Sequence, residues 1–218
     1  MNIGILGTGN LAVTLGRAWA NAGHSVRLTG RNSQHAIRAA DQIGDCAAAV
    51  NPVDFAAQVD VVVVAIAWNG LEQALGLIGA VDGVLAGKTI IDCTNLVDYA
   101  TGNLLPVSAS AAELVAQTAR GAHVVKALHL FAGASWPFTG ALESAPFVAI
   151  CGDDATALNQ TRSLIADLGG HVTVTGRLDS ARQLEDAAGF VMRVVAAGAN
   201  PKFAVPDVDP SLLHDRTT

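Results

Sequence analysis

Apolar residues follow two alternating patterns along the chain. Short runs of consecutive apolar residues, such as "NIGIL" at 2–6 and "VVVVAIA" at 61–67, are typical of strands covered on both faces of a sheet. Between them, as at 10–22, apolar residues recur three and four positions apart, which is the spacing of one helix face. This alternation predicts an α/β fold with a doubly wound parallel sheet of Rossmann type.

The predicted elements continue almost to the end of the chain. Strands are expected at residues 2–6, 25–29, 47–50, 61–67, 89–95, 123–129, 147–151 and 171–175. Helices are expected at residues 10–22, 33–43, 71–81, 110–119, 154–169 and 178–198. Ser110, followed three positions later by Glu113, forms a capping-box pattern and predicts where the fourth of these helices begins.

A break in the alternation predicts two domains. Residues 1–130 are expected to form the first, and the segment 131–146, rich in small residues, prolines and aromatics, a connecting loop. Residues 147–200 are expected to form a smaller C-terminal α/β domain. The proline-rich tail at 201–218 is expected to be extended or loosely held.

Charge and cysteine usage narrow the choice of partners. A net charge of −6 without a basic run argues against nucleic acids and anionic membrane surfaces. The longest apolar run, "VVVVAIAW", is too short to span a membrane. Three widely spaced cysteines predict reduced thiols and a cytoplasmic location. Neither the cysteines nor the six histidines show metal-ligand spacing, so no metal site is expected.

A glycine turn follows the first strand and opens the first helix. Gly7 permits the tight turn, Gly9 lets the backbone approach a pyrophosphate, and Ala12 lets the helix pack near the strand. The helix N-terminus offers free N–H groups and a positive dipole end to the phosphates. The turn therefore predicts a dinucleotide, the alternative being a tight strand–helix connection without a ligand.

The end of the second strand indicates which dinucleotide. An acid there would hold the ribose hydroxyls of NAD, but the strand ends in "LTGRN". Without a carboxylate to repel a 2′-phosphate, Arg31 can bind that phosphate, and Thr29 and Asn32 can donate hydrogen bonds to it. The sequence thus predicts NADP(H), unless Arg31 is simply a solvated loop residue.

Over nearly its whole length the chain resembles the deazaflavin-dependent NADP oxidoreductase family of the coenzyme F-420 type. The segments that carry the resemblance are, in order, "GILGTGNLAVTLGRAWANAGHSVRLTGRN", "DVVVVAIAW", "GKTIIDCTN", "SAAELVAQTARGAHVVKALH", "CGDDATA" and "GRLDSARQLEDAA". The last three are more specific than the glycine turn, because Rossmann proteins in general do not share them. The resemblance implies a Rossmann domain, a small C-terminal domain and direct hydride transfer between NADPH and a deazaflavin.

Two residues depart from the family pattern. Leu96 stands where the family usually has proline, and His129 where it usually has asparagine. Both follow strands, at the sheet edge where the reacting rings are expected to meet. The resemblance therefore supports the fold and the NADP site more strongly than it supports the identity of the hydride acceptor, a deazaflavin-type or flavin-type ring.

The residues expected to bind the cofactor come from the glycine turn and from the strand ends. They are Gly7, Thr8, Gly9, Asn10, Leu11, Thr29, Gly30, Arg31, Asn32, Ala65, Ile66, Ala67, Trp68, Asn95, Ala127 and His129.

Two basic side chains are candidates for chemistry. No catalytic residue is certain from the sequence, and His129 is the first candidate; it can donate a proton, hydrogen-bond the acceptor or the nicotinamide amide, or be a structural histidine. Lys126 lies in an otherwise apolar strand, where an ion pair is a stronger expectation than an acid role.

Apolar side chains outside the core point to further contacts. Trp136 and Phe138 are expected either to stack on a flat ring or to pack on their own protein or a dimer mate. The apolar C-terminal helix, with Val191, Met192, Val194 and Val195, predicts a homodimer.

The function predicted from these residues is that of an NADP(H)-dependent oxidoreductase. Hydride would pass between NADPH and a deazaflavin-type or flavin-type acceptor, a chemistry that needs no side-chain nucleophile. An NADPH-dependent imine or carbonyl reductase is the alternative enzyme, and a non-catalytic sensor of the NADP redox state is the alternative outside enzymes.

Overall fold

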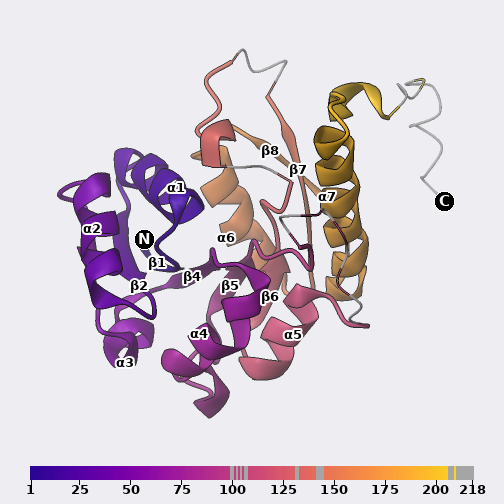
Figure 1. The fold of residues 1–218 in the computed structure, drawn as a ribbon. Helices are drawn as coiled ribbons and strands as arrows, with labels where there is room; N and C mark the ends of the chain where they lie inside the picture. The colour runs from indigo at the N-terminus through magenta and orange to yellow at the C-terminus, as the bar shows by residue number, and fades with distance from the viewer. Residues whose placement is uncertain are drawn as a thin grey trace.

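The computed structural model describes residues 1–98, 101, 103, 105, 108–130, 133–140, 145–205 and 209. Within these residues one eight-stranded sheet runs through the molecule in the order β3-β2-β1-β4-β5-β6-β7-β8, with helices on both faces (Figure 1). The order from β3 to β6 is that of the Rossmann fold. The predicted fold class is therefore confirmed.

The element bounds follow the predicted ones closely at the N-terminal half. The strands are β1 (Asn2–Leu6), β2 (Ser25–Thr29), β3 (Ala47–Ala49), β4 (Val61–Val64), β5 (Thr89–Asp92), β6 (His123–Lys126), β7 (Phe147–Gly152) and β8 (His171–Gly176). The helices are α1 (Asn10–Asn21), α2 (Ser33–Ile43), α3 (Pro52–Phe55), α4 (Leu71–Leu77), α5 (Ala111–Thr118), α6 (Ala155–Ala166) and α7 (Ala181–Ala196).

Several strands and helices are shorter than predicted, and α6 and α7 lose residues at both ends. β4, β5 and β6 end three residues early, because the chain leaves the sheet there to form the edge of the site. α4 ends at Leu77 rather than 81, since Gly79 adopts a left-handed φ of 70° that a helix cannot continue through. α3 was not predicted; it is a single turn begun by Asn51 and Pro52, too short for a periodic pattern.

The C-terminal segment extends the same sheet. β7 runs antiparallel to β6, pairing Val125 with Gly152, and β8 then pairs parallel to β7 and forms the sheet edge. α6 and α7 cover opposite faces of this part (Figure 1). The hydrogen-bonded ladder thus crosses the predicted boundary at 131–146, and the division into two domains stays a prediction.

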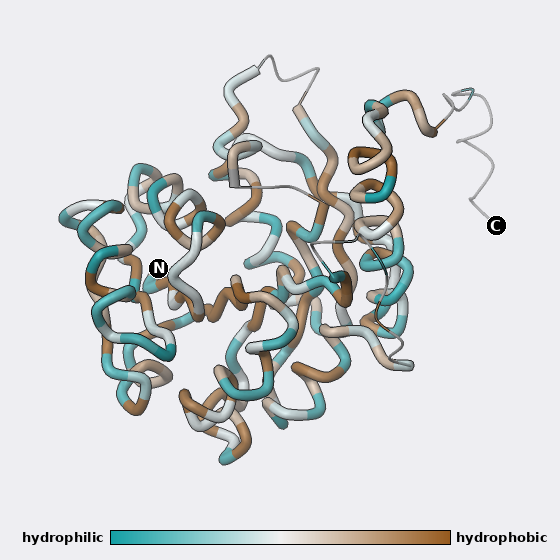
Figure 2. Tube along the Cα trace, viewed as in Figure 1, coloured by the Kyte–Doolittle hydropathy of each residue, from teal (hydrophilic) through white to brown (hydrophobic). Residues whose placement is uncertain are grey.

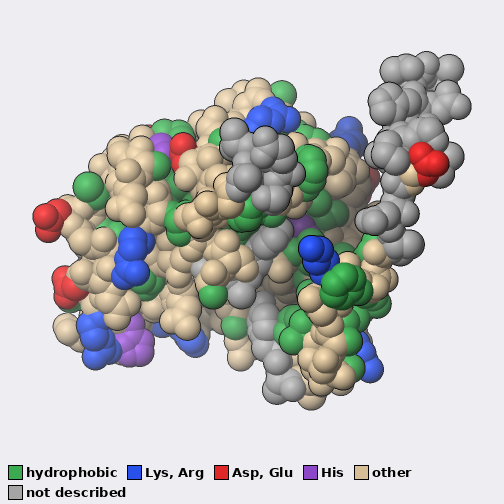
Figure 3. All heavy atoms as spheres, turned by 90° about the horizontal axis from the view of Figure 1, so that it is seen from above, with side chains coloured by type: hydrophobic (Ala, Val, Ile, Leu, Met, Phe, Trp, Pro, Cys, Tyr) green, Lys and Arg blue, Asp and Glu red, His purple; other side chains and the backbone are tan. Residues whose placement is uncertain are grey.

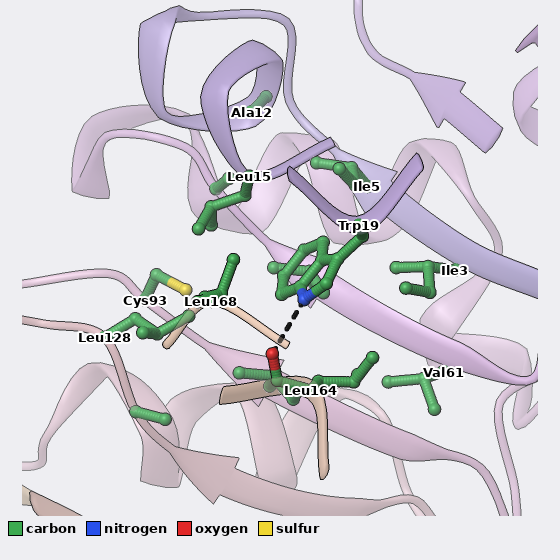
Figure 4. Packing of buried hydrophobic residues seen from close by; sticks show 14 of the residues in the cluster. Ile3, Ile5, Ala12, Leu15, Trp19, Val61, Cys93, Leu128, Leu164 and Leu168 are labelled. Atoms are coloured by element: carbon green, nitrogen blue, oxygen red, sulfur yellow. Dashed lines mark hydrogen bonds between the residues drawn. The ribbon is translucent and has the colours of Figure 1, made fainter. Parts of the chain in front are cut away.

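Two apolar clusters hold the layers together. One lies between the sheet and α1, α2 and α6, and the other between the sheet and α3, α4, α5 and α7. Figure 2 shows the central strands mostly hydrophobic and the outer helices changing between hydrophilic and hydrophobic along their length. Trp19 of α1, fully buried, donates from Nε1 to the carbonyl of Leu164 at 2.9 Å (Figure 4). This bond satisfies a carbonyl in the last turn of α6 and joins α6 to α1.

The aromatic residues Trp136 and Phe138 of the predicted connecting loop pack on their own chain. Trp136 is 3% exposed and lies against Gly170 and Ile165, while the Phe138 backbone N–H bonds the carbonyl of Leu168. Of the two expectations for these aromatics, packing on the protein is the one that the structure has; neither lines the cavities described below. Residues 131, 132 and 141–144 of the predicted loop, and most of the tail, lie outside the described residues.

Charged side chains of one sign do not gather into a large patch on the described part of the face that Figure 3 shows. Lysine, arginine, aspartate and glutamate side chains are scattered over its described part. Among the described residues, no helix is long and apolar enough to cross a membrane, and no group of three metal-ligating side chains occurs. On α7, Phe190 and Val195 are half exposed. Whether they meet a second copy of the chain stays a prediction.

Candidate active site

The glycine turn between β1 and α1 has the geometry that a pyrophosphate needs. Gly7 has a φ of 141°, and a Cβ there would lie 2.3 Å from the carbonyl oxygen of Ala65, so no other residue fits. Gly9 precedes α1 without a side-chain cap, and a Cβ on it would meet nothing within 4 Å. The free N–H groups of α1 therefore face open space in which an anion can approach the backbone.

Two adjoining cavities lie along the carboxyl edge of the parallel strands. The first cavity, about 230 Å³, extends from the glycine turn to Arg31 and the start of α4. The second cavity, about 450 Å³, extends from Gly9 to His129 and one face of α7. Gly9 and residues 65–67 line both, so the two form one track across the sheet edge. In open α/β sheets this edge is where ligands bind.

The end of β2 presents one cation to the first cavity. Arg31 is exposed, and its Nη1 donates to Gln73 Oε1 of α4 at 3.2 Å, which holds the guanidinium across the cavity mouth. The Thr29 hydroxyl donates to the Val50 carbonyl at 3.0 Å, and its role toward a phosphate stays a prediction. Asn32 accepts the N–H groups of Gln34 and His35 through Oδ1 and so caps α2. Arg31 remains the phosphate candidate, with Gln73 as a partner that the sequence did not indicate.

Most of the predicted cofactor residues line one or both cavities. They are Gly7, Thr8, Gly9, Asn10, Leu11, Gly30, Arg31, Ala65, Ile66, Ala67, Asn95 and His129. Two others lie elsewhere. Trp68 lines a groove between α4 and α5 together with Leu71 and Leu114. Ala127 is fully buried in the apolar core.

The wall of the second cavity was in part not predicted. Cys93, Leu128 and Leu130 follow β5 and β6, and one face of α7 closes the far side. That face consists of Ala188, Val191 and Met192, an apolar stripe at helical spacing, of which Val191 and Met192 were predicted to belong to a dimer surface. Only the packing of α7 against the sheet decides that the stripe faces a cavity. Leu96, the other departure from the family pattern, is a core residue.

Asn95 and His129 are two of the polar residues that line the second cavity. Asn95 Nδ2 donates to the backbone carbonyl of His129 at 2.8 Å, which joins the ends of β5 and β6. His129 is 6% exposed, and its position depends on Leu128, a non-glycine residue with a left-handed φ of 57°. Burial, together with the nearby Lys126 ammonium, lowers the pKa of His129 to about 3.

A buried ion cluster lies directly behind this polar pair. Lys126 is fully buried, and its Nζ lies 2.8 Å from Asp92 Oδ2 and 3.0 Å from Glu185 Oε1, and also bonds the Thr94 carbonyl. Burial by itself lowers the pKa of Lys126, but the two carboxylates reverse this and hold it above its ordinary value. Lys126 is therefore a buried, ion-paired cation. The ion pair expected from the sequence, ahead of an acid role, is confirmed.

Glu185 connects this cluster to two helices. It comes from α7 and also accepts the backbone N–H of Ala111, at 3.0 Å, at the start of α5. The capping box that the sequence predicted is present there, with Ser110 and Glu113 satisfying each other's backbone groups. Asp92, Lys126 and Glu185 thus tie β5, β6, α5 and α7 together beneath the second cavity.

The thiol at the cavity wall is inert. Burial, with a smaller contribution from Asp92, raises the pKa of Cys93 to about 12, so the thiolate does not form near neutral pH. Cys151 is a buried residue of β7, and burial is the main cause that raises its pKa to about 12. Among the described residues that line the second cavity, none is charged or poised to exchange a proton near pH 7.

Comparison with known proteins agrees with this geometry. Residues 2–96 match the family model of coenzyme F420-dependent NADP oxidoreductases. This segment carries the glycine turn, the end of β2 and the strand ends as far as Leu96, so the resemblance noted in the sequence is confirmed there.

Solved structures share the fold over most of the chain. A protein from Arthrobacter sp. FB24, proposed to be an F420-dependent NADP reductase, is 29% identical over 91% of this chain and 96% of its own, with a TM-score of 0.79. A protein from Sinorhizobium meliloti is 22% identical over 83% and 87%, with a TM-score of 0.71. A reductive aminase from Aspergillus terreus, in complex with NADPH, is 21% identical over 90% of this chain, which spans 62% of it, with a TM-score of 0.64.

Removing the buried ammonium should destabilise the protein strongly. In Lys126→Met the two carboxylates face each other without a counter-charge, and we expect the free energy of unfolding to fall by about 3–5 kcal/mol in urea denaturation. Lys88→Met is the matched control: Lys88 is half buried and donates only to the Val59 carbonyl, so its loss should cost about 1 kcal/mol. Equal losses in the two variants would show that the cluster has no special weight.

His129 should make the protein less stable in mild acid. Its pKa is lower in the folded state, about 3, than its ordinary value of 6.5, so the unfolded chain binds the proton first. Above pH 6.5 the group has no effect; between pH 6.5 and 3 it removes up to about 1.4 kcal/mol of stability per pH unit. Urea titrations from pH 7 to 4 should show a shallower decline in His129→Phe than in the wild type. An unchanged slope in His129→Phe would contradict the assignment.

Proposed function

From the match of residues 2–96 to the F420-dependent NADP oxidoreductase family, we propose that the chain transfers hydride between NADP(H) and a planar deazaflavin-type or flavin-type ring. The reactive groups belong to the two ligands, since nicotinamide supplies or takes the hydride. The protein's part is to bind both rings, orient them and exclude water.

The first cavity supports the choice of NADP(H). Gly7 permits a tight turn that a Cβ would block against the Ala65 carbonyl, the space beside Gly9 is open, and the uncapped start of α1 offers N–H groups to a pyrophosphate. Arg31, held by Gln73, supplies the positive charge for a 2′-phosphate where an NAD enzyme would carry an acid.

The second cavity carries the proposal for the acceptor. Its walls are mostly apolar, and its proton-bearing side chains, Cys93 and His129, have pKa values of about 12 and about 3. Hydride transfer between two flat rings needs alignment and close approach but no side-chain acid. Residues 65–67 on one side and Ala188, Val191 and Met192 on the other can enclose stacked rings and keep water away from the transfer.

The imine or carbonyl reductase is the second candidate, supported by the shared fold of the reductive aminase. A carbonyl acceptor needs a proton at its oxygen, and His129 is the side chain of the cavity that the sequence offered for this role. Its lowered pKa leaves it neutral near pH 7, which weakens that candidate. A homodimer formed through α7 and a cytoplasmic location are further parts of the proposal.

Turnover should separate these functions. The protein is mixed with NADPH and, in separate reactions, with a deazaflavin, riboflavin or a cyclic imine, and the nicotinamide absorbance near roughly 340 nm is followed. We expect oxidation of NADPH with the deazaflavin or riboflavin and a far slower reaction with the imine. Turnover with the imine alone would favour the reductase, and binding of NADPH without turnover on any acceptor would favour the sensor.

Arg31 should decide between the two nicotinamide cofactors. Losing a charge-assisted contact costs about 1.5–3 kcal/mol. Arg31→Ala should therefore bind NADPH about ten- to a hundredfold more weakly in calorimetric titrations and bind NADH almost unchanged. Arg162→Ala, an exposed substitution on α6, serves as the control and should change neither affinity. If Arg31→Ala weakens both cofactors equally, Arg31 does not contact the 2′-phosphate.

A further inference from the structure

Three polar atoms are left without a hydrogen-bond partner in the described part of the second cavity. They are Asn95 Oδ1 and both ring nitrogens of His129. The two residues are only 5% and 6% exposed, and both line the cavity. Buried polar atoms in proteins nearly always have partners, so a bound molecule is the natural source of these bonds.

The existing hydrogen bond fixes the polarity of Asn95. A backbone carbonyl can only accept, so the atom that faces the carbonyl of His129 at 2.8 Å must be the NH₂ group. The remaining amide atom, Oδ1, is then an acceptor and nothing else. Asn95 Oδ1 can therefore be satisfied only by a donor, such as an N–H of the ligand.

The protonation state of His129 supplies the complementary group. Lys126 on β6 is the cation that acts on His129, and it is paired to Asp92 on β5 and Glu185 on α7, while Cys93 of the cavity wall stays a neutral thiol. A neutral imidazole has one N–H donor and one bare nitrogen. His129 can therefore donate to a carbonyl oxygen while Asn95 accepts from an N–H.

We infer that Asn95 and His129 together recognise a planar amide edge, a C=O beside an N–H, on the ligand of the second cavity. The inference rests on the proposed function, which places two such edges there. One is the carboxamide of the nicotinamide, and the other is the N–H flanked by carbonyls in a flavin-type or deazaflavin-type ring. A carboxylate in place of the amide brings an oxygen against Asn95 Oδ1 and is disfavoured.

The first arm of the test uses nucleotides and equilibrium binding alone. Calorimetry compares NADP⁺ with its nicotinic acid analogue, which carries a carboxylate for the carboxamide, and with 2′-phospho-ADP-ribose, which lacks the ring. If the carboxamide is the edge recognised, the wild type should bind NADP⁺ about tenfold or more tightly than the acid analogue. This comparison needs no variant, so it stands even if a substitution fails to fold.

The second arm tests the acceptor ring. Riboflavin is compared with N3-methylriboflavin, which has lost the N–H between the carbonyls, with and without saturating NADP⁺. If the acceptor ring is recognised, riboflavin should bind about tenfold more tightly than the methylated ring.

Variants of His129 test whether the preference for the amide, in either arm, depends on this residue. His129→Phe keeps a flat side chain without a donor and should abolish the preference, whereas His129→Asn keeps a donor and an acceptor and should retain it. His123→Phe, at the exposed start of β6, should behave as the wild type. Binding of 2′-phospho-ADP-ribose should be the same in all of them.

The outcomes separate the inference from the proposed function. A preference in either arm that His129→Phe removes supports the inference, and the arm identifies the ligand. The absence of a preference in both arms, or a preference that His129→Phe leaves intact, overturns it while the cofactor site stands. If 2′-phospho-ADP-ribose does not bind, the proposed cofactor is wrong, and riboflavin without nucleotide still decides the inference.

Discussion

A buried lysine ammonium must be paired, and that requirement organises the centre of this molecule. Lys126 has no access to solvent, so its charge is stabilised by Asp92, Glu185 and the Thr94 carbonyl. Asp92 and Thr94 come from β5 and the turn after it, and Glu185 comes from α7, which is far away in the sequence. Whichever of them moves leaves a charge unpaired in the interior. The cluster therefore holds α7 in place, and α7 is one wall of the second cavity.

The same cluster sets the chemistry of that cavity. The ammonium behind His129, added to burial, keeps the imidazole neutral, and the carboxylate of Asp92, added to burial, keeps the Cys93 thiol protonated. The cavity then offers hydrogen bonds without mobile protons, an environment suited to holding flat rings in contact rather than to acid–base catalysis. The first cavity has the opposite character, with backbone N–H groups and the Arg31 charge suited to phosphates.

Local patterns in the sequence were enough for the fold and for most residues that line the first cavity. Runs of apolar residues and helical spacing reflect how a strand or a helix buries its own side chains, so β1, α1, β2 and α2 were predicted nearly to the residue. Gly7, Gly9 and Arg31 were found from backbone geometry and from position at a strand end, which are also local features. The single-turn helix α3 was missed because four residues show no period.

The sequence by itself determined the Rossmann-type order of elements, the glycine turn and the end of β2 without an acid. Tertiary structure alone decided that Lys126 is paired by Glu185 across 59 positions, that Ala188, Val191 and Met192 face a cavity, and that Trp68 turns away from it. It also decided that the Thr29 hydroxyl donates to the Val50 carbonyl. The reason is physical: a side chain's partners depend on which elements pack against it. That packing is a property of the whole sheet and its helices, not of the neighbouring residues in the chain.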